Sequence, residues 1–223
     1  MSTDLPDVSG VSIGILGGTG DQGKGLARRF ALAGHTVLIG SRTEERAREA
    51  AESIAGAGSV RGAANAAVAA EADVVIVAVP WEGHRATLES LRAELAGKIV
   101  IDCVNPLGFD KQGAYALPVE EGSAAQQAAA VLPDSRVVGA FHHVSAVLLL
   151  DPEVEEVDLD VLVLGDDREA TDTVQALANR IAGVRGVYGG RLRNAHQVEA
   201  LTANLISINR RYKAHAGFRV TDV

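Results

Sequence analysis

Three glycines with the spacing Gly18-x-Gly20-x-x-Gly23 follow the apolar segment Ile13–Leu16 and precede a segment typical of a helix. A glycine turn between a strand and a helix is the context in which this spacing binds the pyrophosphate of a dinucleotide. Gly18 would permit the tight turn, Gly20 would let the backbone approach the pyrophosphate, and Gly23 would let the helix pack closely. The start of the helix would offer unpaired N–H groups to the anion. A glycine turn without a ligand is the alternative, and the complete strand–turn–helix unit makes it the weaker one.

One hydroxyl and two guanidinium groups follow the next apolar segment, residues 36–40. An NAD site usually has Asp or Glu there, which holds the ribose 2′-hydroxyl. Ser41 and Arg42 stand there instead, and a guanidinium binds the 2′-phosphate that a carboxylate would repel. Arg46 lies one helical turn beyond, and Thr19 supplies a further hydroxyl. The sequence therefore predicts NADP(H) as the cofactor. Alternatively the two arginines belong to a solvated helix face with neighbouring glutamates, which leaves the missing carboxylate unexplained.

Strand-like and helix-like segments alternate along the chain, a pattern typical of an α/β fold with a doubly wound parallel sheet of the Rossmann type. We expect strands at residues 13–16, 36–40, 73–79, 98–102, 137–141 and 161–165, short extended segments near residue 60 and at 186–188, and helices at 26–32, 44–54, 63–70, 81–95, 171–181 and 195–216. We divide the chain into a flexible N-terminus (1–10), an NADP-binding domain (11–150) and a smaller, mainly helical C-terminal domain (151–223) that closes the active-site cleft.

Ligands of such sheets bind beyond the carboxyl ends of the strands, and that rule selects three further turns. They are Val79-Pro80-Trp81, the segment around Asn105, and residues 142–146. We expect these turns to surround the nicotinamide and the group that exchanges a hydride with it. Trp81 is interpreted as a pocket wall, although a tryptophan after a strand also packs against helix starts. His142 either donates a hydrogen bond to a ligand or is a buried histidine satisfied by backbone.

The composition excludes several classes of protein. A single cysteine, Cys103, rules out a disulfide framework and a cysteine-based metal cluster, and we expect no metal site. The net charge of −8 argues against a nucleic-acid binder. No apolar run is long enough to span a membrane, and residues 1–10 do not resemble a signal peptide, so we expect a cytoplasmic protein. The acidic segment 151–160 is expected to be an exposed connection.

The C-terminal segment has the opposite charge balance. Residues 185–223 carry seven basic and two acidic side chains, which suggests a site for an anionic small molecule, a subunit interface or a solvated helix face. An apolar stripe of Leu201, Leu205 and Ile208 would cover the cleft or pair with a second subunit. We expect a homodimer.

Several of these motifs together resemble those of a known family. Gly17-Gly18-Thr19-Gly20-x-x-Gly23-Lys24-Gly25, Gly40-Ser41-Arg42 and Val79-Pro80-Trp81-Glu82 resemble the NADPH-dependent reductases of the 8-hydroxy-5-deazaflavin coenzyme F420. The same N-terminal pattern occurs in the NADPH domain of membrane ferric reductases, which carry transmembrane helices. The resemblance implies hydride transfer between carbon 4 of nicotinamide and carbon 5 of the deazaflavin.

The resemblance also implies which residues meet the two ligands. For NADP(H) they are Thr19, Gly20, Asp21, Gln22, Ser41, Arg42 and Arg46, to which position in the fold adds Gly18, Gly23, Val79, Pro80, Trp81 and Asn105. For the deazaflavin ring they are His142, Val144 and Ala146, and candidates for its anionic tail are Arg191, Arg193, Arg210, Arg211 and Lys213. A subunit contact would use the same basic residues equally well.

Hydride transfer between two conjugated rings needs proximity and orientation more than a protein acid, so we expect no catalytic residue. The Tyr-x-x-x-Lys pair of short-chain dehydrogenases is missing from the sequence. Two other hypotheses stay open at this point. One is an NADPH-dependent reductase of flavin, ferric chelate or a small imine, and the other is a non-catalytic NADP sensor that binds a partner.

Overall fold

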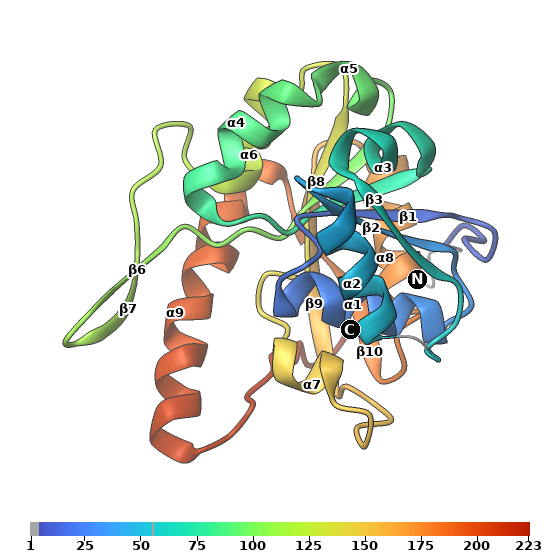
Figure 1. Ribbon diagram of the computed structural model, residues 1–223. Coiled ribbons are helices and arrows are strands. Elements are labelled where there is room, and N and C mark those ends of the chain that lie inside the picture. Colours follow the sequence, from blue (N-terminus) through green and yellow to red (C-terminus); the bar gives the residue numbers. More distant parts are fainter. Residues whose placement is uncertain (1–4, 55) are drawn as a thin grey trace.

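The fold is a twisted eight-stranded sheet with helices on both faces, in a computed structural model that describes residues 5–54 and 56–223 (Figure 1). The strand order is β10-β9-β8-β5-β4-β1-β2-β3. The strands are β1 (Ile13–Leu16), β2 (Val37–Ser41), β3 (Val60–Ala64), β4 (Val74–Val77), β5 (Ile99–Asp102), β8 (Arg136–Gly139), β9 (Leu159–Gly165) and β10 (Val184–Gly190). The central strands are buried along their whole length, because helices cover both faces and the strands are continuous apolar runs.

Six neighbouring strands, from β3 to β8, are parallel as predicted. The last two depart from the prediction, because β9 is antiparallel to β8 and β10 runs parallel to β9. Both strands belong to the same sheet as the strands before them. The division of the chain at residue 150 stays a prediction, and residues 159–190 continue the sheet across it.

The helices divide between the two faces of the sheet, which is what a doubly wound fold requires. One buried cluster contains side chains of α1, α2, α7 and α8, and the other contains side chains of α3 to α6. The helices are α1 (Asp21–Leu32), α2 (Glu44–Ser53), α3 (Asn65–Glu71), α4 (His84–Ser90), α5 (Arg92–Leu95), α6 (Ala124–Val131), α7 (Ala146–Leu150), α8 (Arg168–Ala178) and α9 (Ala195–Tyr212), with short 3₁₀ turns at Trp81–Gly83 and Leu192–Asn194.

Several predicted boundaries were wrong. The expected helix 81–95 is a 3₁₀ turn followed by α4 and α5, because Leu91 leaves the helical region at φ −120° and ψ 12°. The last helix ends at Tyr212 rather than at residue 216, because Lys213 adopts a left-handed conformation with φ 50°. The helices α6 and α7 were not predicted. Neither was the hairpin of β6 (Leu107–Asp110) and β7 (Gly113–Ala116).

The hairpin and α9 form an arm beside the sheet, where β7 packs against the helix (Figure 1). The chain then returns to the sheet, and Asp160 is its anchor. The Asp160 carboxylate is fully buried, accepts two hydrogen bonds from Arg185 at 2.9 and 2.7 Å, and pairs with Arg219 at 2.9 Å. The expectation that residues 151–160 are an exposed connection is therefore wrong at Asp160 and at the buried Val157. Two guanidinium groups compensate the buried carboxylate.

The N-terminal segment is only partly described. Residues 1–4 of the predicted flexible segment 1–10 lie outside the described residues, and Val8 is buried in the core. No helix within residues 5–54 and 56–223 has the length and apolar character that a membrane crossing demands.

Candidate active site

The glycine turn joins β1 to α1, and each of its glycines meets a different constraint. Gly17 has φ +67°, a conformation that favours glycine, so this residue makes the sharp turn that the sequence assigned to Gly18. A Cβ on Gly23 would lie 2.6 Å from the Cα of Gly18, so the predicted close packing involves the turn itself. A Cβ on Gly20 would meet nothing within 4 Å. Only Gly20 therefore leaves open space in front of the backbone.

The start of α1 is available to an anion. Gly20 is the N-cap, and no side chain of the described residues accepts a hydrogen bond from the first turn of the helix. The first N–H groups of a helix have no partner within the helix, and they carry the positive end of its dipole. Asp21 is exposed and forms an ion pair with Lys24 at 3.4 Å. The turn and the helix start thus have the features that the pyrophosphate of a dinucleotide needs.

A groove of about 640 Å³ lies over this turn and reaches the end of β2. Arg42 and Arg46 are exposed, and neither forms an ion pair with a carboxylate in the described part of the chain. The buried Ser41 lies beside them. Predicted residues that line the groove are Thr19, Gly20, Asp21, Gln22, Gly23, Ser41, Arg42, Arg46, Val79 and Pro80. Gly18 is buried behind the turn and does not line the groove.

The groove also contains Asn65 and Thr87, which sequence reasoning missed. Asn65 directly follows β3, and its Oδ1 accepts a weak hydrogen bond from the N–H of Gly17 at 3.4 Å. The rule that ligands bind beyond the carboxyl ends of strands selects this position as well. It was missed because β3 was not recognised as a full strand. Thr87 lies inside α4, and no pattern in the sequence identifies it.

A second cavity, of about 310 Å³, adjoins the groove at the carboxyl ends of β4, β5 and β8. The two cavities share Gln22, Ala78, Val79 and Pro80, so they are continuous. The other lining residues are Trp81, Cys103, Val104, Asn105, His142, Val144 and Thr202. The predicted residues Trp81, Asn105, His142 and Val144 are thus brought together. Ala146 lies outside both cavities, because it begins α7, which packs against α1 at Gly25.

Hydrogen bonds fix the wall of the second cavity. The carbonyl oxygen of His142 accepts from the Asn105 side-chain amide at 2.7 Å and from the Thr202 hydroxyl at 3.1 Å. The Gln22 amide donates to the carbonyl oxygen of Phe141 at 3.2 Å. Phe141 has φ 62°, which costs energy for a residue with a side chain and persists because the surroundings hold it. Segments far apart in the sequence therefore hold residues 141–142 in one conformation.

Comparison with known proteins agrees with this arrangement. Residues 12–106 match the family model described as NADP oxidoreductase, coenzyme F420-dependent. The chain is 43% identical over 223 residues to the F420-dependent NADP reductase of Methanothermobacter thermautotrophicus, and the alignment covers 96% of each chain. It is 41% identical to the reductase of that name from Methanocaldococcus jannaschii, over 96% of this chain and 99% of the relative. The chain belongs to the F420-dependent NADP reductase family.

A solved structure supports the same assignment at the level of the fold. A candidate F420-dependent NADP-reductase from Arthrobacter sp. fb24 superposes with a TM-score of 0.81 at 29% identity. The match covers 95% of this chain and all of the other.

Behind the second cavity of this family member lies a cluster of buried polar side chains. His84 is held between Asp102, at 2.6 Å from its Nε2, and Gln127, at 3.0 Å from its Nδ1. Glu199 accepts hydrogen bonds from the N–H groups of Ala124 and Ala125, at the start of α6. Burial nevertheless raises the pKa of Glu199 to about 7, against the effect of those two bonds.

The side chain of His142 is fully buried within this cluster. Its Nε2 lies 3.9 Å from a Glu199 oxygen, and neither ring nitrogen has a hydrogen-bond partner among the residues that the structure describes. Burial lowers the pKa of His142 to about 4, so the ring is neutral at pH 7. Of the two interpretations from sequence, the structure favours a buried histidine, although its ring is not satisfied by backbone. The thiol of Cys103 is also buried, and burial raises its pKa. This agrees with the interpretation of Cys103 as a small core residue.

Arg29 is a further residue that the sequence gave no reason to select. It is 4% exposed and donates hydrogen bonds to the carbonyl oxygens of Leu148, Leu149, Asp151 and Glu155. These carbonyls include the C-terminal end of α7, where a cation is favourable. Arg29 therefore fixes α7 to α1 and, through α7, the segment 142–146 that walls the second cavity.

Proposed function

We propose that the groove and the second cavity form one active site, in which a hydride passes between NADP(H) and the deazaflavin coenzyme F420. The observation that carries this proposal is their continuity through Gln22, Ala78, Val79 and Pro80. One cavity has a glycine turn and two arginines that form no ion pair within residues 5–54 and 56–223, and the other is lined by neutral side chains. Hydride transfer needs a site with a charged end for the dinucleotide next to an uncharged end where the two rings stack.

The groove supplies the contacts for NADP(H). The open space at Gly20 admits the pyrophosphate to the backbone and to the start of α1. Ser41, Arg42 and Arg46 supply a hydroxyl and two guanidinium groups for the 2′-phosphate. The groove runs from there to Val79 and Pro80, where the nicotinamide would lie. This assignment explains why neither arginine pairs with a carboxylate in the part of the chain that the structure describes.

The second cavity supplies a rigid wall for the two rings. The apolar side chains of Trp81, Val79 and Val144 line this cavity and would exclude water from the bound rings. The backbone carbonyl of His142 is held in place by two hydrogen-bond donors, Asn105 and Thr202. When both ligands are bound, carbon 4 of nicotinamide exchanges a hydride with carbon 5 of the deazaflavin. The protein orients the rings and excludes water, and in this proposal no side chain acts as acid or base.

We also propose that the chain forms a homodimer. The arm of hairpin and α9 exposes the large apolar side chains of Tyr115, Ile208 and Tyr212, which supports a subunit contact on this arm. Light scattering on the purified protein measures the mass directly. The cytoplasmic location expected from the sequence stays a prediction, which fractionation of the source cells would test.

A spectrophotometric assay tests the reaction. The protein is mixed with NADPH and the oxidised deazaflavin coenzyme, and the visible absorbance band of the coenzyme is followed. We expect rapid bleaching with NADPH and little with NADH. Bleaching of flavin mononucleotide instead would favour a flavin reductase. NADPH binding without turnover of any acceptor would favour a sensor, and either result would contradict the proposal.

A further inference from the structure

A third cavity, of about 580 Å³, lies in the arm between the β6–β7 hairpin and the C-terminal half of α9. Phe109 and Gln112 line it from the hairpin, and Arg210 and Arg211 line it from the last turns of the helix. Figure 1 shows the hairpin lying along α9 on the side of the molecule away from the sheet. This region takes no part in the site described above.

The third cavity shares no lining residue with the second, but the same two segments of the chain supply lining residues to both. On α9, Thr202 lines the second cavity and Ile206, one turn later, lines the third. On the other segment, Asn105 lines the second cavity and Phe109 lines the third. The helix rises 1.5 Å per residue, so Arg210 lies about 12 Å along the axis from Thr202. A ligand tail that leaves the second cavity between these two segments would pass Ile206 and reach Arg210 and Arg211.

The charges of the cavity favour an anion. Arg210 and Arg211 are exposed and form no ion pair with any carboxylate in the described part of this acidic protein, which carries −8 overall. Asp110 also lines the cavity, but its Oδ1 already accepts hydrogen bonds from the N–H groups of Gln112 and Gly113 in the hairpin turn. The lining therefore carries two positive charges against the one negative charge of Asp110, and no ion pair joins them in the described part of the chain.

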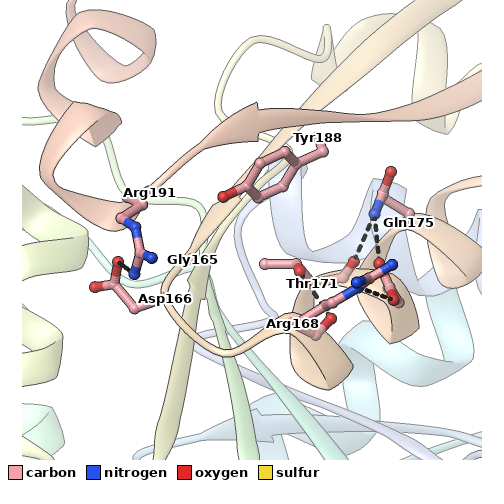
Figure 2. Close-up of a pocket in the computed structure, with 8 residues that line it drawn as sticks. Gly165, Asp166, Arg168, Thr171, Gln175, Tyr188 and Arg191 are labelled. Carbon is pink, nitrogen blue, oxygen red and sulfur yellow. Dashed lines mark hydrogen bonds and ion pairs between the residues drawn. The ribbon is translucent and has the colours of Figure 1, made fainter.

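Another basic pocket of the C-terminal segment lacks this property. Arg191 and Arg168 line a cavity of about 390 Å³ at the end of β9 (Figure 2). There Arg191 pairs with Asp166 and Arg168 pairs with Asp172, each at 3.6 Å. Gly165 is level with Val138 of β8, so this pocket does not lie beyond the carboxyl ends of the parallel strands. Its charges are balanced, and it is separate from the ring site.

We propose that the third cavity binds the anionic tail of the deazaflavin coenzyme, its phosphate and glutamates, with Arg210 and Arg211 as the cationic contacts. The proposal rests on the function proposed above, which places the ring in the second cavity. It assigns the recognition of the tail to the arm and separates Arg210 and Arg211 from the other basic residues of the segment.

Steady-state kinetics with two acceptors tests this assignment. One acceptor is the full coenzyme, and the other is the deazaflavin riboside that lacks the phosphate and the glutamates. The variant carries Arg210→Gln and Arg211→Gln, and the control carries Arg168→Gln, an exposed arginine of the separate, charge-balanced pocket at the end of β9. We expect the double variant to raise KM for the full coenzyme about tenfold, because it loses two charge-assisted contacts. The increase is no larger because solvent screens exposed charges.

The other parameters are expected to stay unchanged. These are kcat, KM for NADPH and KM for the riboside, and the control variant should match the wild type throughout. Raising the salt concentration should raise the wild-type KM for the full coenzyme and leave that for the riboside unchanged. Equal changes for both acceptors, or no change for either, would overturn the assignment. So would a change in the mass of the double variant by light scattering, which would identify a subunit contact.

The outcomes separate this proposal from the proposed function. If the wild type turns over neither acceptor, the proposed function fails and the tail site fails with it. If both acceptors are turned over and the double variant does not distinguish them, only the tail site is refuted.

Discussion

Replacing Arg42 by alanine should weaken the binding of NADPH and leave the binding of NADH nearly unchanged. The two dinucleotides differ only by the 2′-phosphate, which is the group that Arg42 is proposed to contact at the end of β2. The arginine has no competing carboxylate partner in the described part of the chain, so its full hydrogen-bonding capacity is available to a ligand. The comparison between the two ligands removes every effect of the substitution on the rest of the groove.

The expected magnitude follows from the type of contact. A hydrogen bond to a charged group contributes about 1.5–3 kcal/mol, and each 1.4 kcal/mol corresponds to about a factor of ten in Kd. Arg42 is exposed and its interaction is screened, so the lower end applies. We expect Kd for NADPH to rise about tenfold with Arg42→Ala, and further when Arg46 is replaced as well.

Fluorescence titration of the protein with each dinucleotide measures this difference. Arg48→Ala is the matched control, because Arg48 lies nearby on α2 but pairs with Glu44 and does not line the groove. The control should bind both dinucleotides like the wild type. Equal losses of NADPH and NADH affinity in Arg42→Ala would refute the assignment of the 2′-phosphate to this residue.

Three further predictions concern the turn, the wall and pH. Gly20→Val should raise Kd for NADPH at least about tenfold without lowering Tm, because its Cβ meets only open space, and a fall in Tm would contradict this. Arg29→Met should raise KM for the deazaflavin more than KM for NADPH; equal changes would mean a purely structural role, and Arg29→Lys should restore part of the difference. Burial lowers the pKa of His142 and His143 from 6.5 to about 4, so their contribution to stability is complete above pH 6.5 and is lost as pH falls toward 4. Each histidine should lower the free energy of unfolding by about 3 kcal/mol over this pH range. Urea unfolding at several pH values should therefore show a smaller loss of unfolding free energy at low pH in His143→Phe than in the wild type.

The sequence predicted the parallel part of the sheet and the dinucleotide groove, because both depend on local patterns. Continuous apolar runs identified β1, β4 and β5, and the glycine spacing identified the turn between β1 and α1. The rule about the carboxyl ends of strands then brought Trp81, Asn105, His142 and Val144 to one cavity. These inferences needed no information about distant contacts.

The features that were missed depend on contacts between distant segments. The reversal of β9 cannot be read from its apolar run, which looks the same in either direction. The buried Asp160 depends on Arg185 and Arg219, which lie 25 and 59 residues away along the chain. The amide of Asn105 and the hydroxyl of Thr202 meet at one carbonyl, and neither has a local pattern that marks it. The same holds for Arg29, which is one of several arginines in α1 and its surroundings.

The wall segment 141–146 is held from three directions, and the proposed reaction gives a reason for this. On the cavity side, Asn105 and Thr202 fix the carbonyl of His142. At the far end of α7, Arg29 binds the carbonyls that close the helix. Behind the segment, the ring of Phe218 packs against that of His143, with the ring centroids 5.9 Å apart, on a tail that Asp160 anchors.

A reaction without a protein acid or base depends on how closely and how long the two rings stay in register. An error of about 1 Å in placement can lower a rate on the order of a hundredfold. The energy that the fold spends on an unfavourable φ at Phe141 and on unpartnered ring nitrogens at His142 is therefore consistent with a site whose main task is positioning. On this view the residues that matter most for the rate, after those that touch the ligands, are the anchors Arg29 and Asp160, which touch neither ligand.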